Sequence, residues 1–434
     1  MTFDVIVVGG GPAGATAAKV LGDAGISTLL MDKSAFPRDK PCGGGISARV
    51  LNRFPYLKDA LARIPVNWVR KVYFESPSGY AVDYQTKDPI YLMIRRLEFD
   101  NLLFSLARER VTYQPGALVR KITFHPDEVQ VVAEVDGELR TYRSRMVVGC
   151  DGANSIVARS AGLRSGGVQS VYAIDMMEET PYKELNLAER DRIFIYYRIR
   201  SHYGYGYVFP KKQHINLGVG FKLDYYLSHL RGGHYPHHRT FVDDLTKKRL
   251  LAGSSNRDNF RAFPLPISGP LPRTYGDRVL VCGDAGGFVN ALTAEGIYYA
   301  MVSGELAGRT TFAAVQQSQF SASQLCAYEQ TWNQEIGVEL KKSVSLQKLL
   351  LGDPNRVDRI VRAASRNAQL TELLARYATG ALSHSEFKRH LICRALPLYI
   401  KEKLRGLFGA APRDTLPAAP ASRDILSDRA SRSS

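Results

Sequence analysis

Residues 4–14 read DVIVVGGGPAG and decide the fold of the first part of the chain. The valines and the isoleucine predict a buried strand, and the glycines after it have the spacing G-x-G-x-x-G directly before a predicted helix. In this motif the first glycine makes the tight turn, the second lets the backbone approach a pyrophosphate, and the third lets the helix pack close to the strand. The helix N-terminus then attracts the phosphate charge. We therefore predict a dinucleotide site that includes Gly9, Gly11, Pro12, Ala13 and Gly14.

A second strand follows this helix and completes a βαβ unit. The run Ser27–Met31 predicts that strand, and Asp32 comes directly after it. A carboxylate at this place accepts hydrogen bonds from ribose hydroxyls, so we predict that Asp32 and its neighbour Lys33 contact the nucleotide. An ordinary glycine turn is the alternative, but strand, helix and distant acid all occur in the order that the motif requires.

The composition is that of a globular protein long enough for two packed domains. The 434 residues are 45% hydrophobic and 23% charged, with a formal net charge of +16. The five cysteines lack the spacing of a zinc ribbon or a disulfide framework, which is typical of a reducing compartment. The sequence shows no basic, apolar leader and no run of 18 apolar residues, which predicts a cytoplasmic protein without a transmembrane segment.

Two further segments indicate which nucleotide is bound. Val147–Gly152 with Ser155 resembles the D-G motif of the flavoprotein hydroxylase superfamily, and Val279–Gly286 resembles its G-D motif. The resemblance implies that Asp284 binds a ribityl hydroxyl of FAD and that the N-terminus of the following helix faces the flavin. The sequence R-x-x-F-D that begins at Arg96 matches a helix arginine that contacts FAD in many relatives. The FAD residues implied by these motifs are Arg96, Asp151, Gly283 and Asp284.

The chain also resembles the geranylgeranyl reductase family in three segments. Residues 40–47 (KPCGGGIS) are similar to the C-G-G-G segment of that family, and residues 283–297 (GDAGGFVNALTAEGI) are similar to its extended G-D segment. Residues 205–210 (YGYVFP) are similar to its Y-x-W-x-F-P substrate motif. The resemblance adds to the predicted FAD residues Cys42, Gly43, Gly44, Gly296 and Ile297.

The chain departs from the family pattern at three of these positions. The family usually has proline at Ala291, glycine at Ala294 and tryptophan at Tyr207. A tyrosine keeps the aromatic wall of the prenyl pocket but adds a hydroxyl that must find a partner. These departures leave the identity of the prenyl substrate open.

The resemblance implies hydride transfer from reduced FAD to one alkene carbon of a prenyl chain, with a proton delivered to the other carbon. An isolated alkene has no carbonyl to stabilise charge, so the site must be dry, must hold the double bond near the flavin and must supply an acid. The candidate catalytic residues are Cys42, Tyr205 and Tyr207, with a small buried filler as the alternative role of the cysteine and plain sheet packing as that of the tyrosines. The predicted substrate residues are Tyr205, Tyr207, Phe209 and Pro210.

The predicted fold class is α/β + β. It combines a Rossmann-like FAD-binding domain of the p-hydroxybenzoate hydroxylase type, an antiparallel-sheet substrate domain and a helical C-terminus. Within it, Arg95–Arg110 has helical spacing, Asp136-Gly137 predicts a hairpin turn, and Asp353-Pro354 predicts the N-cap and first position of a helix. The expected boundaries are 1–65, 95–165 and 271–330 for the FAD-binding domain, 66–94 and 166–270 for the substrate domain, 331–409 for the helical region and 410–434 for a disordered tail.

Two further sequence features, a histidine cluster and a basic segment, are weaker indications of function. His234, His237 and His238 lie among Gly, Pro and Tyr without cysteine or acidic ligands nearby, so we predict a solvated loop and no metal. Residues 387–408 alternate basic and apolar residues and predict an amphipathic helix, which either contacts a membrane surface from the cytoplasmic side or packs on its own protein. The positive charge is spread over the chain, and this argues against nucleic-acid binding.

Two rival functions follow from the same fold. A monooxygenase or halogenase is one of them. A halogenase is expected to carry W-x-W-x-I-P, where this chain has YGYVFP. A hydroxylase is expected to carry histidine and proline in its extended G-D segment, where this chain has Gly287 and Ala291 near those places. A flavin-binding module that only carries electrons at a membrane surface is the other. We predict instead a monomeric FAD-dependent reductase of prenylated lipids or isoprenoids, with NADPH or ferredoxin as the electron donor.

Overall fold

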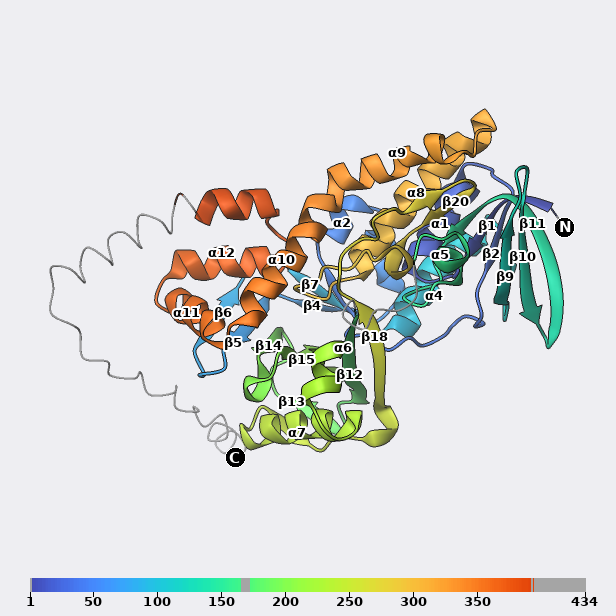
Figure 1. Cartoon of the computed structure of the whole chain (residues 1–434). Helices are drawn as coiled ribbons and strands as arrows, with labels where there is room; N and C mark the ends of the chain where they lie inside the picture. Colours follow the sequence, from blue (N-terminus) through green and yellow to red (C-terminus); the bar gives the residue numbers. More distant parts are fainter. Residues whose placement is uncertain (1, 165–171, 392, 394–434) are drawn as a thin grey trace, which may run out of the picture. The chain divides into compact units, whose positions relative to one another are not determined.

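The computed structural model describes residues 2–164, 172–391 and 393. Contacts divide the chain after Phe387, and the elements below belong to the compact unit that ends there. The predicted α/β + β class is confirmed, since parallel strands with helices and a separate, largely antiparallel sheet are both present (Figure 1). The predicted tail at 410–434 and nearly all of the predicted helix at 387–408 lie outside the described residues.

The first sheet carries the glycine motif at the end of a central strand. Its eight strands run in the order β19-β20-β11-β1-β2-β8, with β10 paired to β11 and β9 paired to β10. The strand bounds are β1 Thr2–Val8, β2 Thr28–Met31, β8 Thr112–Gln114, β9 Leu118–Phe124, β10 Val129–Val135, β11 Glu138–Gly149, β19 Tyr275–Gly276 and β20 Val279–Val281. The predicted hairpin at Asp136-Gly137 joins β10 to β11.

Alternation along β1 divides the hydrophobic core between the two faces of this sheet. Val5 and Val7 pack against helices, whereas Ile6 and Val8 pack against the strands β9 and β10. The helices on the first face are α1 (Pro12–Asp23), α4 (Arg96–Arg108), α8 (Ile297–Gln317) and α9 (Ala322–Trp332). Because α1 packs along both α4 and α8, segments that are far apart in the sequence meet next to the glycine turn.

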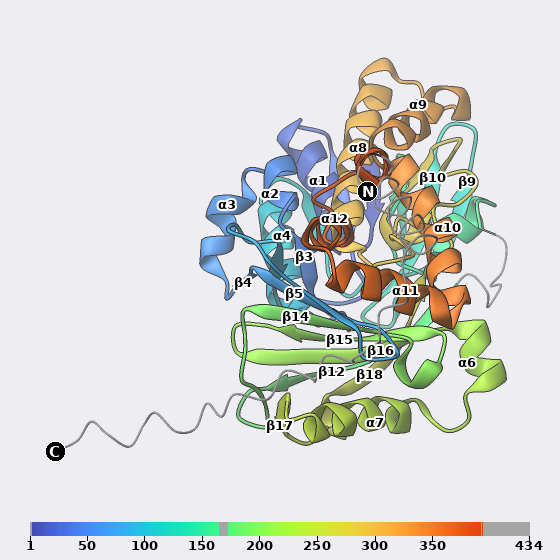
Figure 2. The same ribbon diagram turned by 90° about the vertical axis from the view of Figure 1, so that its left-hand side faces the viewer.

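The second sheet has seven strands in the order β18-β12-β16-β15-β14-β5-β6, and all neighbours are antiparallel except β14 and β5. The strand bounds are β5 Lys71–Glu75, β6 Ala81–Gln85, β12 Tyr172–Pro181, β14 Arg192–Tyr197, β15 Gly204–Pro210, β16 His214–Lys222 and β18 Phe260–Pro266. One face packs against α6 (Leu223–His229) and α7 (His234–Lys247), and the other packs against α11 (Pro354–Ser365) and α12 (Ala368–Ala378) (Figure 2).

Further elements belong to the same compact unit. They are α2 (Val50–Arg53), α3 (Leu57–Ala60), α5 (Ile156–Ser160), α10 (Val338–Gly352), a three-stranded sheet of β3 (Gly45–Ser47), β7 (Tyr91–Met93) and β4 (Asn67–Val69), and a pair of β13 (Leu185–Leu187) and β17 (Leu251–Gly253). The predicted signal at Asp353-Pro354 is confirmed, because the Asp353 side chain accepts a hydrogen bond from the backbone N–H of Asn355 at the start of α11.

The predicted solvated loop at the three histidines is wrong. His234 begins the helix α7, and His238 is fully buried with its Nε2 3.2 Å from the Leu217 carbonyl oxygen. The apolar positions Phe241, Val242 and Leu245 hold this helix against the sheet, and their spacing outweighs the Gly, Pro and Tyr content at its start.

Candidate active site

The glycine turn after β1 is too closely packed for a side chain at Gly9 and at Gly14. Gly9 has a φ of +102°, and a Cβ there would lie 2.3 Å from the Cys150 carbonyl oxygen. A Cβ on Gly14 would lie 1.7 Å from the Gly9 carbonyl oxygen, so α1 packs directly on the turn. In the described part of the chain no side chain caps α1, and Pro12 stands in its first turn. An uncapped helix N-terminus behind a bare turn fits a pyrophosphate.

The acid after β2 supports the same turn. Asp32 accepts hydrogen bonds from the backbone N–H of Gly10 at 2.7 Å and of Ser34 at 2.9 Å. It is buried, whereas Lys33 beside it is exposed. Each carboxylate oxygen still has a lone pair to offer, so the predicted contact with a ribose hydroxyl is compatible with these bonds and stays a prediction.

Arg96 belongs to a buried cluster of charges on α4. Its Nε and Nη2 donate to the two carboxylate oxygens of Asp100 at 2.6 Å each, and Arg38 donates to the same carboxylate at 3.0 Å. The Arg38 guanidinium also reaches the glycine turn, because a Cβ on Gly11 would lie 3.4 Å from its Nη2. Arg38 is a candidate phosphate ligand that the sequence analysis missed, although it stands only four residues before Cys42.

The D-G motif uses its carboxylate within the protein. Asp151 accepts hydrogen bonds from the Ser155 hydroxyl at 2.5 Å and from the backbone N–H of Ile156 at 2.7 Å. It thereby holds the N-terminus of α5, whose N-cap is Ser155. The side chain fixes the turn that faces Gly9, and its predicted contact with FAD stays a prediction.

The G-D motif lies against the glycine turn. A Cβ on Gly283 would come within 3.0 Å of the Ala13 Cβ, so the motif after β20 and the start of α1 are in contact. Asp284 pairs with Lys40 at 3.1 Å. Burial alone would raise the pKa of Asp284, but Lys40, followed by Arg96 and Arg164, lowers it below its usual value. The lowered pKa favours the ionised carboxylate, which is a stronger acceptor for a hydroxyl group than the protonated form.

The C-G-G-G segment is held in place by contacts with the second sheet. Gly44 has a φ of +69°, and a Cβ there would lie 2.1 Å from the Ile94 carbonyl oxygen. The Cys42 carbonyl accepts a hydrogen bond from Asn216 on β16 at 3.2 Å. Lys211, which is fully buried and paired with Glu179, lies beneath the same loop. The loop is thus fixed by groups that follow the Y-x-Y-x-F-P strand.

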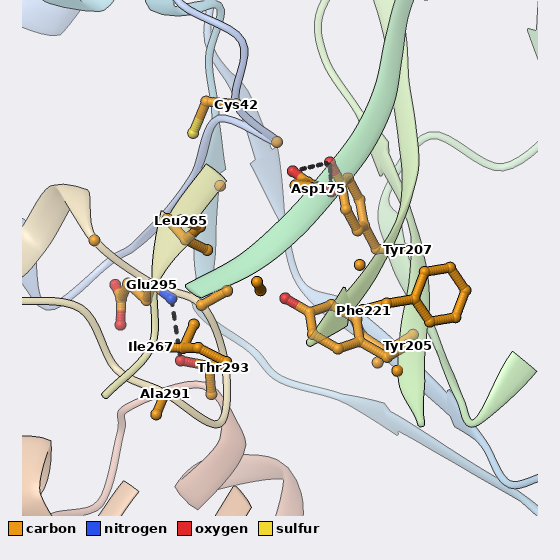
Figure 3. A pocket seen from close by; sticks show the side chains of 18 of the residues that line it. Cys42, Asp175, Tyr205, Tyr207, Phe221, Leu265, Ile267, Ala291, Thr293 and Glu295 are labelled. Carbon is orange, nitrogen blue, oxygen red and sulfur yellow. Dashed lines mark hydrogen bonds between the residues drawn. The ribbon is translucent and has the colours of Figure 1, made fainter. Parts of the chain in front are cut away.

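A cavity of about 130 Å³ lies between this loop, the second sheet and the extended G-D segment (Figure 3). Most of the side chains around it are apolar or aromatic. Among the predicted residues it is lined by Cys42, Gly43, Gly44, Tyr205, Tyr207, Phe209, Gly296 and Ile297. Pro210 is buried at the end of β15 and does not line the cavity. The cavity therefore brings together the predicted substrate strand and two of the segments predicted to hold FAD.

The hydroxyl of Tyr207 has a carboxylate as its hydrogen-bond partner. It donates a hydrogen bond to Asp175 Oδ2 at 3.1 Å, and both residues line the cavity (Figure 3). Tyr207 on β15 is paired with Gly218 on β16, and a Cβ there would lie 2.7 Å from the Tyr207 hydroxyl. Glycine at this position opens the space through which the phenol reaches β12. Asp175 was missed by the sequence analysis because no motif marks it.

Burial raises the pKa of Asp175 to about 7, although the hydrogen bonds from Tyr207 and from the Met176 backbone lower it. The pKa of Tyr207 is raised well above its usual value, by burial first and by Asp175 second. A carboxyl group whose pKa is raised toward neutrality therefore faces an otherwise largely apolar cavity.

A second carboxylate in the cavity wall is neutralised by an arginine. Glu295 pairs with Arg49 at 3.0 Å and accepts the backbone N–H of Ser47 at 3.2 Å. Arg49 also pairs with Glu339 on α10 at 3.1 Å and donates to the Tyr299 hydroxyl. This network joins the segment before α8 to α10 and closes one side of the cavity.

A metal centre and a membrane-spanning helix are both absent from the described residues. In residues 2–164, 172–391 and 393 no three His, Cys, Asp or Glu side chains are grouped so that they would hold a metal ion. No helix in the same part of the chain has the length and apolar character needed to cross a bilayer.

Comparison with known proteins identifies relatives along most of the chain. A family profile described as an FAD binding domain matches residues 2–334. The digeranylgeranylglycerophospholipid reductase 1 of Methanopyrus kandleri is 31% identical over 358 residues, which cover 77% of this chain and 87% of the relative. The geranylgeranyl diphosphate reductase of Synechocystis is 30% identical over 357 residues, which cover 78% and 82%. A geranylgeranyl bacteriochlorophyll reductase-like structure from Thermoplasma acidophilum has a TM-score of 0.76 at 21% identity, with 90% of this chain and 98% of that chain covered.

Proposed function

The chain belongs to the geranylgeranyl reductase family of FAD-binding proteins, and from this premise we propose that it saturates isolated C=C bonds in the prenyl chain of a lipid or isoprenoid. The observation that carries the proposal is the cavity. Its aromatic wall of Tyr205, Tyr207 and Phe209 faces the two glycine-rich segments that the family resemblance assigns to FAD. An apolar site of this kind suits an alkene better than a charged or polar substrate.

The residues described above fit FAD. The turn from Gly9 to Gly14 would hold its pyrophosphate, and Asp284, kept ionised by Lys40, would accept a ribityl hydroxyl. Arg38 and Arg96, locked together by Asp100, place positive charge beside the same turn. When bound and reduced, FAD supplies the hydride.

The second sheet orients the prenyl chain and excludes water. Tyr205, Tyr207 and Phe209 alternate along β15 and present one aromatic face, with ring centroids 6.4 Å apart for the first pair and 4.6 Å for the second. Gly43 and Gly45 keep the opposite loop thin, since a Cβ on either would come within 3.3 Å of the Phe209 ring. A double bond held between them is kept in a dry, fixed position.

The electron donor and the cellular place are further parts of the proposal. NADPH or ferredoxin would supply the electrons for the flavin, and the protein would work as a monomer in the cytoplasm. The basic and apolar residues of 387–408 would then contact the membrane surface where a prenylated lipid resides. This contact is supported by the sequence alone.

The test is an anaerobic single turnover. The purified yellow protein is reduced with dithionite and mixed with geranylgeranyl diphosphate, a digeranylgeranylglycerol lipid or menaquinone. We expect at least one of them to reoxidise the flavin and to gain two hydrogens for each event in its mass spectrum. Cys42→Ala and Tyr205→Ala are expected to slow this step while FAD stays bound, because both side chains line the cavity. Normal turnover in both variants would remove these two residues from the site.

The rival function gives a different result in the same preparation. A monooxygenase or halogenase would leave the prenyl chains unchanged and would couple NADPH oxidation to oxygen uptake. Reversible flavin reduction without turnover of any prenyl compound would favour the electron-carrying module instead.

A further inference from the structure

The proposed function requires an acid, and the cavity contains one that no family motif marks. Resting on that function, we propose that Asp175 donates the proton to the alkene carbon that does not receive the hydride, and that Tyr207 positions Asp175 for this step. Asp175 is a catalytic residue in this scheme because it faces the reacting bond. Tyr207 is a positioning residue because it acts through the carboxyl group.

The strand register explains how the two side chains meet. Tyr207 and Asp175 stand on β15 and β12, which are separated by β16. The β16 positions paired with them are Gly218 and Gly220, and neither has a side chain that would block the phenol. The hydroxyl lies 3.1 Å from Oδ2 and 3.5 Å from Oδ1 of Asp175. The phenol lies nearer to Oδ2, and the Met176 backbone also donates to the carboxyl group, whose oxygens together still have a lone pair that can carry the acidic proton.

The surroundings keep Asp175 protonated in a useful range of pH. Burial raises its pKa to about 7, near the value at which an acid and its conjugate base are both available at neutral pH. Partial exposure of Asp175 is directed into the cavity that it lines. On β18, its paired residue is Phe263, which does not titrate. The other titratable side chains that line the cavity are Cys42, Tyr91, Tyr203, Tyr205, Lys222 and Glu295.

Two of those side chains are poorer acids for this step. Glu295 is bound by Arg49 and by the Ser47 backbone, so its carboxyl oxygens are already engaged. Burial and the charge of Asp175 raise the pKa of Tyr205 far above neutrality, so its phenol releases a proton reluctantly. Asp175 is hydrogen-bonded too, but among the described residues no cation pairs with it, and its pKa is raised to about 7.

The step balances in atoms and electrons. The hydride forms the first new C–H bond, and the electron pair of the π bond takes the Asp175 proton to form the second. Asp175 is left as a carboxylate, which the Tyr207 hydroxyl stabilises by its hydrogen bond, and solvent water returns the proton before the next turnover. The alkene gains one hydride and one proton.

The first experiment measures the single-turnover rate of flavin reoxidation by geranylgeranyl diphosphate from pH 5.5 to 8.5. In the natural protein the rate should fall as the pH rises through about 7, because the acid is lost. Asp175→Asn should slow the step by about 100-fold and abolish this fall. The matched control is Asp83→Asn, which removes a carboxylate from β6 of the same sheet outside the cavity and should keep the natural rate and profile.

Tyr207→Phe tests the positioning role. The Tyr207 hydrogen bond lowers the pKa of Asp175, so its loss should move the fall in rate to higher pH. Tyr207→Trp, which introduces the usual family residue, replaces the phenol with an indole N–H that can also donate to Asp175, so it should move the profile less than Tyr207→Phe does. A profile that does not move in either variant would overturn the role of Tyr207.

A second readout does not depend on turnover. Infrared difference spectra of the FAD-loaded protein should show a protonated carboxyl band that titrates near pH 7, that is lost in Asp175→Asn and that persists in Asp83→Asn. Equal FAD content confirms that each variant is folded. If the natural protein reduces prenyl chains and Asp175→Asn does so equally fast, the proton donor is wrong and the reductase stands. If the natural protein reduces no prenyl compound, the proposed function fails and this inference fails with it.

Discussion

Glycine residues in this chain differ sharply in what surrounds them. A Cβ on Gly14 would lie 1.7 Å from the Gly9 carbonyl oxygen, whereas a Cβ on Gly352 would meet nothing within 4 Å. The first position cannot accept even a methyl group without moving α1 away from the turn. The second lies at the end of α10, outside the cavity and the glycine turn.

Gly14→Ala is therefore expected to release FAD. Moving α1 displaces the helix N-terminus that would bind the pyrophosphate, and we expect FAD affinity to fall at least about 10-fold, with a loss of about 2–4 kcal/mol in folding free energy. The measurement is the ratio of flavin absorbance to protein after gel filtration, together with thermal unfolding. Gly352→Ala is the matched control and should keep the full yellow colour. Equal flavin content in both variants would contradict the argument.

Some residues of the site could be predicted from the sequence and others could not, for a physical reason. Tyr207 was marked because a buried hydroxyl in place of an indole requires a partner, and the partner exists. Asp175 was not predicted, because it is 32 positions away and reaches Tyr207 only through the pairing of β12, β16 and β15. Arg38 was missed in the same way, since only the folded chain brings it to Gly11.

At the scale of elements, α7 contributes a buried histidine to the substrate sheet. His238 is fully buried, lies 3.7 Å from Glu178 of β12, and has its pKa lowered to about 4 by burial. The distance alone resembles an ion pair, but burial keeps the imidazole neutral near pH 7. The neutral form holds α7 on β16 through the Leu217 carbonyl.

Acid should therefore loosen α7. In the unfolded chain His238 titrates near its usual pKa of 6.5, so the stability it contributes is complete above that pH and is lost as the pH falls toward 4. This loss amounts to at most about 3 kcal/mol. His238→Gln, which does not titrate, should show a smaller decrease in unfolding free energy between pH 6.5 and 4 than the natural protein. His125→Gln, at an exposed histidine, should follow the natural protein, and identical curves for all three would contradict the prediction.

Elements with a regular hydrophobic spacing or a clear local turn or capping signal were predicted best. The hairpin at Asp136-Gly137, the helix α4 and the start of α11 follow from turn residues, helical spacing and an N-cap that act locally. The helices α6 and α7 were missed, because short apolar spacings were embedded in a region rich in Tyr, Gly and Pro. Their helical state depends on packing against the sheet, which local spacing does not reveal.

At the scale of the whole molecule, the proposed FAD residues come from segments spread over nearly 300 positions. Three of these segments lie close together because α1 packs against both α4 and α8. They are Gly9–Gly14, Arg96 and Gly283–Asp284. The fold class was predictable from the order of these motifs. The cavity was predictable only as a requirement, since its walls combine the second sheet with the C-G-G-G loop and the extended G-D segment, which are far apart in the sequence.

Bound FAD should therefore raise the free energy of unfolding of the whole compact unit. At a free FAD concentration 100 times its Kd we expect about 2.7 kcal/mol of added stability, because a ligand that bridges distant segments binds only the folded state. Circular dichroism and flavin fluorescence recorded during heating should show coincident transitions that rise together with FAD concentration. Flavin release well below the loss of secondary structure would contradict this.

The position of β20 has a consequence for biosynthesis. This strand pairs with β11 and carries Asp284 at its end, yet the ribosome makes it long after the glycine turn, α1 and the whole second sheet. A nascent chain that stops before β20 has a sheet with an open edge beside β11 and lacks the carboxylate for the ribityl group. Cofactor uptake is thus expected only after residue 284 of the 434 has been made, which places it in about the last third of translation.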